Sequence, residues 1–124
     1  MKIQELLNKR VLILDGAMGT EIQKREIPTW GENKRGEKLE GCSEALNLYA
    51  PEVITGIHSS YLQAGANILK TNTFGVMPWV LAEYGLESQC KEIAALGVLL
   101  AKSCIKAHKA LENQQNALFV AASL

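Results

Sequence analysis

The sequence predicts an α/β domain in which short apolar strands alternate with amphipathic helices. Three apolar segments, at residues 11–14, 67–71 and 117–123, have the length and composition of strands. The first of them shows no alternation of polar and apolar residues, which is typical of a strand covered on both faces in a parallel sheet. Helical periodicity fills the intervals between the segments. This order predicts parallel strands joined by right-handed crossovers.

The first interval predicts a short helix, a long loop and a longer helix. Asp15-Gly16 ends the first strand, and residues 17–24 favour a short helix that an internal glycine weakens. Proline, glycine and charged residues are frequent from Ile27 to Leu48, which predicts a long loop. Pro51 suits a first helical turn and Ala64-Gly65 suits a carboxyl-terminal cap, so we expect a helix of about four turns between them. The apolar residues on its buried face are Ile54, Ile57, Tyr61 and Leu62.

A long helix dominates the second interval. The strand at residues 67–71 carries one unexpected charge, Lys70. A helical region follows Pro78 and is interrupted near Gly85, and a long helix runs from about Ser88 to Asn113. Apolar residues recur along this helix at spacings of three and four, which predicts one buried face. They are Ile93, Leu96, Leu100, Cys104, Ala107 and Leu111.

The composition indicates a globular domain. Hydrophobic residues make up 48% of the 124 residues, and the 13 basic and 13 acidic residues cancel. A chain without net charge has no field that attracts nucleic acid or an anionic membrane surface, so neither is expected as a partner. No apolar run reaches the roughly 18 residues of a membrane span, and the first residues lack the apolar core of a signal peptide. We therefore expect a cytoplasmic protein.

Two polar loops that follow predicted strands form the candidate site. Asp15 ends the first strand, and small residues after it let backbone N–H groups approach a ligand closely. Polar residues also follow the second strand, and ligands bind at the carboxyl ends of parallel strands, so the two loops are expected to converge at one mouth. A carboxylate beside free amides is suited to the ammonium and carboxylate of an amino acid. The candidate residues are Asp15, Gly16, Ala17, Met18, Gly19, Asn72 and Thr73.

Each loop also has a simpler explanation as a turn. An Asp-Gly pair is more often a turn than a binding site, and Asn72 and Thr73 are equally suited to satisfying nearby backbone groups. The G-x-G-x-x-G spacing and the Gly-Lys-Ser/Thr motif are both missing, which excludes a dinucleotide-binding loop and a P-loop.

The three cysteines are expected to be reduced and structural. Cys42 lies in the long loop, whereas Cys90 and Cys104 lie on the long helix. Their odd number and wide spacing do not fit a disulfide framework, and no C-x-x-C pair is present. A zinc site built from this chain alone is therefore not expected.

The histidines are not expected to act as bases, and the tryptophans have two interpretations. His58 falls on the inward side of its helix, where it is packed or bonded to the backbone, and His108 lies among lysines in solvent. Trp30 and Trp79 either pack against the core or cap the mouth.

Three ordered motifs resemble the opening of a known family. They are L-D-G-A-M-G-T-E-I-Q at residues 14–23, G-C-S-E-A-L-N-L at residues 41–48 and Y-L-Q-A-G-A-N-I-L-K-T-N-T-F-G at residues 61–75, and A-E-Y-G-L at residues 82–86 adds to them. They resemble the homocysteine-binding domain shared by cobalamin-dependent methionine synthase and the stand-alone homocysteine S-methyltransferases. The D-G-A-M-G-T run is most similar to the methionine synthase type.

The resemblance implies a fold, a substrate and a metal. The fold is the amino-terminal portion, about three β/α units, of a TIM-type (β/α)8 barrel. Residues 1–124 would then form a partial homocysteine-binding domain that is truncated. In the family, zinc binds the homocysteine sulfur and favours the thiolate, which attacks a methyl group on a corrinoid or a methylsulfonium donor. The zinc-binding cysteines come from late strands that this sequence does not reach, so no metal ligand and no catalytic residue are expected here.

By the same resemblance, Asp15 and the amides of residues 16–19 help to hold the amino acid end of homocysteine. Asn72 and Thr73 would line the mouth of the site. Residues 76–79 depart from the family pattern, which has smaller and more basic residues there.

Two functions remain open on the sequence alone. The first is part of a methyltransferase that converts homocysteine into methionine, with cobalamin or a methyltetrahydrofolate domain as source of the methyl group. The second is a noncatalytic module that binds a small ligand or completes a barrel. An uncovered third strand has unpaired edges, so self-association is expected. The alternative to a truncated barrel is a small sheet that a partner chain completes.

Overall fold

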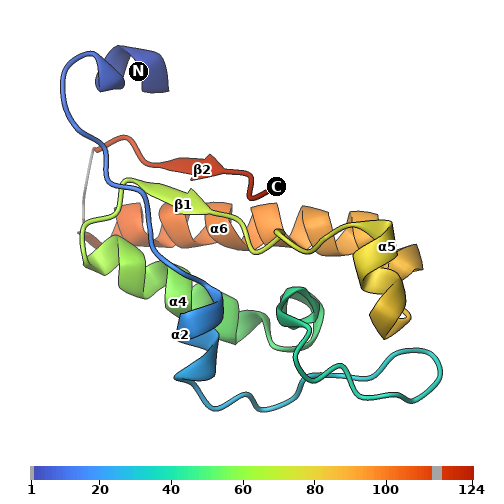
Figure 1. Cartoon of the computed structure of the whole chain (residues 1–124). Coiled ribbons are helices and arrows are strands. Elements are labelled where there is room, and N and C mark those ends of the chain that lie inside the picture. Colours follow the sequence, from blue (N-terminus) through green and yellow to red (C-terminus); the bar gives the residue numbers. More distant parts are fainter. Residues whose placement is uncertain (1, 113–115) are drawn as a thin grey trace.

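The computed structural model describes residues 2–112 and 116–124 and has an α/β architecture, in which two long helices lie along a small parallel sheet (Figure 1). No helix within these residues is long and apolar enough to cross a membrane. The elements in chain order are α1 (Ile3–Leu7), α2 (Gly19–Gln23), η1 (Ser43–Ala45), α3 (Leu46–Tyr49), α4 (Pro51–Gln63), β1 (Ile68–Lys70), α5 (Pro78–Leu81), η2 (Ala82–Tyr84), η3 (Glu87–Gln89), α6 (Cys90–Glu112) and β2 (Phe119–Ala121).

The three predicted strand segments lie side by side and parallel. β1 pairs with β2 in parallel, with Ile68 opposite Phe119. On the other side of β1, Leu14 forms a single parallel bridge with Ile68. The predicted order and direction of the three segments are therefore confirmed, but the first segment forms only a bridge where a strand was expected.

The side chain of Asp15 explains why the first segment leaves the sheet. Its backbone N–H donates to the carbonyl of Ile68 at 2.9 Å, as a parallel ladder requires. The next rung would join the N–H of Lys70 to the backbone carbonyl of Asp15. Instead, that N–H donates to the two carboxylate oxygens of Asp15, each at 3.2 Å. The carboxylate replaces the backbone carbonyl, so the ladder stops at this residue.

The prediction that the first segment is covered on both faces is wrong for this chain. Val11 is 87% exposed and Leu14 is 50% exposed. Among the described residues, β1 is the only strand beside this segment, so little apolar surface is available to cover its side chains.

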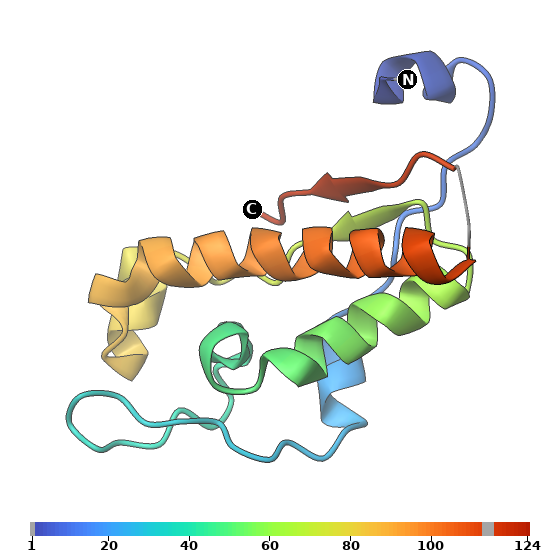
Figure 2. The ribbon, with the colours of Figure 1, turned by 180° about the vertical axis from the view of Figure 1, so that it is seen from behind.

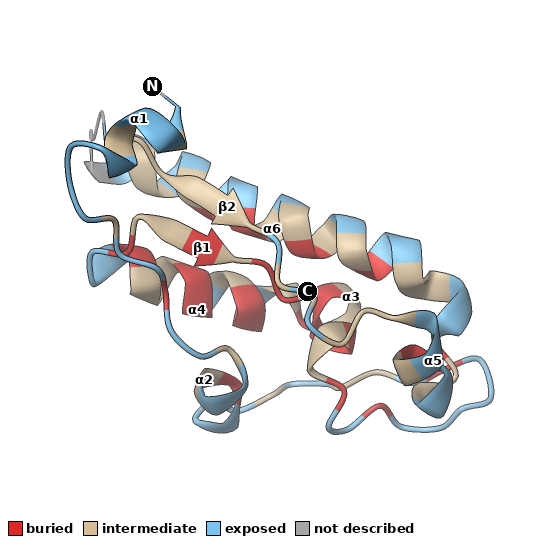
Figure 3. Cartoon of the chain, turned by 45° about the horizontal axis from the view of Figure 1, so that its top comes forward, coloured by how far each residue is buried: buried red, intermediate tan, exposed pale blue. Residues whose placement is uncertain are grey.

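α4 and α6 pack together along one face of the sheet (Figures 1 and 2). α4 begins at Pro51 and ends at Gln63 before the cap residue Ala64, as predicted. Leu69, in the middle of β1, is fully buried and packs with Leu62 of α4 and Ala101 of α6. This cluster is one of three in the core and lies between the strands and the helix pair. A second cluster joins α2, α3 and α4, and a third joins the long loop and η1 to α5 and the start of α6. Buried positions accordingly occur on the inner sides of α4 and α6 and also on α3 and α5 (Figure 3).

The long predicted helix is confirmed within the described residues, although its buried face changes along its length. α6 begins at Cys90 instead of Ser88, and Asn113 lies outside the described residues. Ala107 and Leu111, expected on the buried face, are exposed, whereas Ile105 and His108 are half-buried. The buried face of α6 therefore turns toward its carboxyl-terminal end, and α4 lies inclined to α6 (Figure 2).

The long loop is shorter than predicted. α2 lies within the predicted helix at residues 17–24, and the loop that follows ends at Cys42, after which η1 and α3 supply two helical turns before α4. The helical region after Pro78 is interrupted at Gly85, as predicted.

Candidate functional site

A hollow of about 190 Å³ lies at the carboxyl ends of the first segment, β1 and β2. Every predicted site residue except Ala17 lines it, so the structure brings the two polar loops together. A hollow of about 250 Å³ lies at the opposite end of β1, beside Gly65 and Asn67, away from these loops. The residues around the first hollow are Asp15, Gly16, Met18, Gly19, Lys70, Thr71, Asn72, Thr73, Phe74 and Ser123.

Asp15 is the most buried charged group of this hollow. Only 2% of its side chain is exposed, and both carboxylate oxygens accept from the N–H of Lys70. Burial raises the pKa of the Asp15 carboxyl, and the N–H and ammonium of Lys70 oppose this effect without overcoming it. The carboxylate therefore ends the hydrogen-bond ladder between the first segment and β1. It also presents a poorly solvated negative charge to the hollow.

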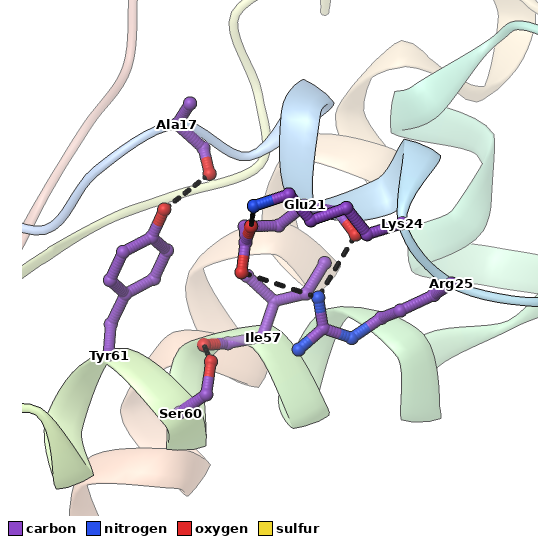
Figure 4. A network of polar contacts seen from close by, with 7 residues as sticks. All are labelled: Ala17, Glu21, Lys24, Arg25, Ile57, Ser60 and Tyr61. Atoms are coloured by element: carbon purple, nitrogen blue, oxygen red, sulfur yellow. Dashed lines mark hydrogen bonds and ion pairs between the residues drawn. The ribbon is translucent and has the colours of Figure 1, made fainter.

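The loop after Asp15 rests on Tyr61 of α4. The Tyr61 hydroxyl donates to the carbonyl of Ala17 at 2.7 Å (Figure 4). Burial, with the nearby carboxylates of Glu21 and Asp15, raises the pKa of Tyr61, which keeps this donor protonated. Gly16 is required by this contact, because a Cβ there would lie 2.8 Å from the Tyr61 oxygen. Ala17 is thus bound to α4 through its carbonyl and does not line the hollow.

The backbone N–H groups of this loop are free. Within residues 2–112 and 116–124, none of the amides of residues 16–19 donates a hydrogen bond. Three of these residues, Gly16, Met18 and Gly19, line the hollow. Short α2 follows, where Glu21 pairs with Lys24 at 3.0 Å (Figure 4). The loop therefore offers unused donors beside the Asp15 carboxylate.

Asn72 is held by a second asparagine, Asn47 of α3. The Asn72 Nδ2 donates to Asn47 Oδ1 and to the carbonyl of Ser43, each at 3.0 Å. The Asn47 Nδ2 donates to the carbonyls of Asn72, at 2.9 Å, and Ile93, at 3.2 Å. All four amide hydrogens of the pair are therefore used inside the protein. The amide nitrogen of Asn72 fixes the loop and is not available to a ligand.

Thr73 closes a ring of three hydrogen bonds with Thr71 and Ser123. The Thr73 hydroxyl donates to the carbonyl of Ser123 at 2.9 Å, so its single hydrogen is used. The Thr71 hydroxyl, 2.6 Å away, must then donate to Thr73, and it accepts from the Ser123 N–H at 3.2 Å. This ring joins the loop after β1 to the chain after β2.

Gly97 lets α6 approach the Asn72–Thr73 loop. A Cβ at Gly97 would lie 2.6 Å from the methyl carbon of Thr73 and 3.4 Å from the carbonyl of Asn72. Glu44 adds a contact at the loop's far end, since its carboxylate accepts from the N–H of Gly75 at 3.1 Å. The loop is therefore held by contacts with Asn47 of α3, Gly97 of α6 and Glu44 of η1.

The cysteines do not form a metal site in the described part of the chain. No group of three His, Cys, Asp or Glu side chains there is arranged to hold a metal ion. Cys42 and Cys104 are buried in separate apolar clusters, and burial raises the pKa of both thiols, which disfavours the thiolate that binds metal. Cys90 packs against the cluster that contains Cys42. These residues do not fit a zinc ion.

The histidines and tryptophans lie outside the hollow. His58 is fully buried, and neither ring nitrogen has a hydrogen-bond partner among the residues that the structure describes, so it is packed but not bonded to the backbone. His108 is half-buried, which corrects the expectation of a solvated side chain. Trp30 packs against the core, while Trp79 is 70% exposed and does not line the hollow.

Sequence reasoning missed three residues that shape the site. Lys70 was noted only as an unexpected charge, yet it lines the hollow beside Asp15. Asn47 and Tyr61 come from helices and fix the two loops. A polar residue at a position that should be apolar was the available signal for Lys70. The partners of Asn47 and Tyr61 required the tertiary structure.

Comparison with known proteins gives one consistent family. The family model described as homocysteine S-methyltransferase matches residues 12–124. A curated methionine synthase from Mycobacterium leprae is 39% identical over 98 residues, which cover 79% of this chain and 8% of that protein. The methionine synthase of Mycobacterium tuberculosis is 37% identical over the same length.

Solved structures agree with this result. The oxidized form of the homocysteine methyltransferase MmuM from Escherichia coli matches with a TM-score of 0.77 and 32% identity, covering 96% of this chain and 39% of that one. Its metallated form matches with a TM-score of 0.76 and 31% identity, covering 97% and 40%. The chain thus spans well under half the length of these relatives. It belongs to the homocysteine S-methyltransferase family.

Proposed function

We propose that this chain is part of an enzyme that transfers a methyl group to the thiol of homocysteine to give methionine. The chain supplies part of the substrate-binding mouth, as the first β/α units of a TIM-type barrel. One observation carries the proposal: the buried carboxylate of Asp15 stands beside the unused amides of residues 16–19 at the carboxyl ends of parallel strands.

The two groups complement the amino acid end of homocysteine. The ionised carboxylate of Asp15 accepts hydrogen bonds from the substrate ammonium, which is a charge-assisted interaction in a poorly solvated place. The free amides of residues 16–19 donate to the substrate carboxylate. Asn72 and Thr73 line the mouth and keep the second loop in place through bonds inside the protein.

The chemistry at the sulfur is not assigned to this chain. A metallated relative supports a metal in the complete enzyme, and we propose that it is zinc held by cysteines outside these residues. From the family resemblance, we also propose a corrinoid or methyltetrahydrofolate domain as the source of the methyl group. The cytoplasmic location that we propose follows from the sequence pattern described above.

Titration of the isotope-labelled chain with L-homocysteine under reducing conditions tests the proposed binding. We expect the amide signals of residues 16–19 and 70–75 to move together. Asp15→Asn keeps an oxygen that caps the ladder but removes the charge, so it should weaken binding about tenfold or more. Glu21→Gln, a nearby carboxylate that does not line the hollow, is the matched control and should change affinity less than twofold. Unchanged signals at both loops at high homocysteine concentration would refute the proposal.

A further inference from the structure

Lys70 projects from the face of β1 that the helices do not cover. Side chains of a strand alternate between its two faces, and Leu69 is fully buried against α4 and α6. Ile68 and Lys70 therefore lie on the opposite face. The Lys70 side chain is 38% exposed and lines the hollow next to Asp15.

The ammonium of Lys70 has hydrogen-bond donors to spare. Its Nζ lies 4.0 Å from the nearest Asp15 oxygen, which is beyond hydrogen-bonding distance. No oxygen in the described part of the chain accepts a hydrogen bond from it, although its backbone N–H is bonded to Asp15. A lysine ammonium carries three donors, so all three are available to a ligand in the hollow.

Lys70 and Asp15 form a loose ion pair, with 4.0 Å between Nζ and the nearest carboxylate oxygen. A lysine that only balances a buried carboxylate is expected to contact it at about 2.8 Å, because a charge-assisted hydrogen bond is stronger than a separated pair. Here the two charges stand apart at the edge of one hollow, one positive and one negative. Such a pair complements a ligand whose ammonium and carboxylate groups are attached to the same carbon, as they are in an α-amino acid.

We infer that Lys70 binds the α-carboxylate of the substrate while Asp15 binds its α-ammonium, so that the pair selects an intact amino acid. This inference rests on the proposed function and deepens it, because it assigns a specificity-determining residue to the same site. The free amides of residues 16–19 supply further donors to the same carboxylate. A thiol that lacks the carboxylate leaves the ammonium of Lys70 without a partner and adds a second positive charge beside it.

Two ligands separate this role from a structural one. L-Homocysteine and 3-aminopropane-1-thiol share the thiol and the amine, but only the first has a carboxylate. Both are titrated into the wild-type chain and into Lys70→Met and Lys70→Gln under reducing conditions, with dissociation constants taken from amide shifts. We expect both variants to bind homocysteine about tenfold more weakly and to bind the aminothiol as well as, or better than, the wild type. Lys24→Met, a lysine of α2 outside the hollow, is the control and should change neither constant.

The outcomes distinguish a failure of the Lys70 inference from a failure of the proposed function. Equal weakening of both ligands would show that Lys70 only positions Asp15, and an unchanged affinity for homocysteine would remove Lys70 from the site; either result overturns the inference. If the wild type binds homocysteine and Asp15→Asn weakens it while the Lys70 variants do not, the proposed function stands without this inference. If the wild type does not bind homocysteine, both are overturned.

Discussion

Acid should destabilise this chain through His58. The side chain is fully buried on α4, one helical turn from Ile54 and from Leu62, and neither ring nitrogen has a partner among the described residues. Burial lowers the pKa of His58 from 6.5 to about 4, because the charged imidazolium is disfavoured away from water. In the unfolded chain the same ring takes up a proton near its ordinary pKa.

The sign and size of the effect follow from this difference. Between pH 6.5 and about 4 the unfolded chain binds more protons than the folded one, so the free energy of unfolding falls as the pH falls. The stability linked to neutral His58 is fully present above pH 6.5 and is lost as the pH falls toward 4. The whole difference corresponds to about 3 kcal/mol, and the step from pH 7 to pH 5 to about 2 kcal/mol. That is a large share of the roughly 5–15 kcal/mol of an ordinary domain.

Urea denaturation of the wild type and His58→Leu, followed by circular dichroism at pH 7 and pH 5, measures this effect. Leucine fills a similar volume without polar atoms, so we expect its stability to depend less on pH, by about 2 kcal/mol over this interval. Other titrating groups are common to both proteins and cancel in the difference. Equal losses of stability for the two proteins would refute the reasoning.

Four further predictions concern the site and the edges of the sheet. Asp15→Asn should be at least as stable as the wild type at pH 7, because burial raises the pKa of Asp15 and its ionisation therefore destabilises the folded state. The difference in stability should vanish below pH 3.8, where the carboxyl is protonated in both the folded and the unfolded chain. A variant that is less stable than the wild type at pH 7 would contradict this. Thr73→Val should lose about 1–2 kcal/mol in urea denaturation, because it breaks the bonds to Thr71 and Ser123; unchanged stability would show that the ring contributes nothing. Metal analysis after dialysis should find no stoichiometric zinc, whereas tight zinc binding would disprove the assignment of the cysteines as structural. Sedimentation velocity should show self-association through the open strand edges, and a monomer at all concentrations would speak against it.

Local chemistry made much of the fold predictable. Pro51 and Gly65 bracket α4 because one suits a first turn and the other follows a helix end, and both constraints act within a few residues. The parallel direction of the three segments followed from the alternation of strands and helices along the chain. The end of the first strand did not, because Asp15 stops the ladder through a side-chain contact with Lys70, 55 residues away.

The sequence predicted where the site lies, but not which polar groups face a ligand and which bond to the protein itself. The strand ends located both loops, and the structure assembles them around one hollow. Asn72 and Thr73 looked equally suited to a ligand and to the backbone, and only their bonds to Asn47 and Ser123 show that much of their polar capacity is used inside the protein. These partners are distant in sequence, so no local pattern reveals them.

The most direct test of the proposed function replaces the matched part of E. coli MmuM with residues 12–124 and measures methionine formation from homocysteine. The relative supplies the remaining chain and the metal, while this chain supplies its part of the substrate-binding mouth. We predict a folded, metallated chimera that forms methionine and loses most of that activity on Asp15→Asn, with Glu21→Gln unaffected. A folded and metallated chimera that forms no methionine, or one that Asp15→Asn leaves fully active, would contradict the account.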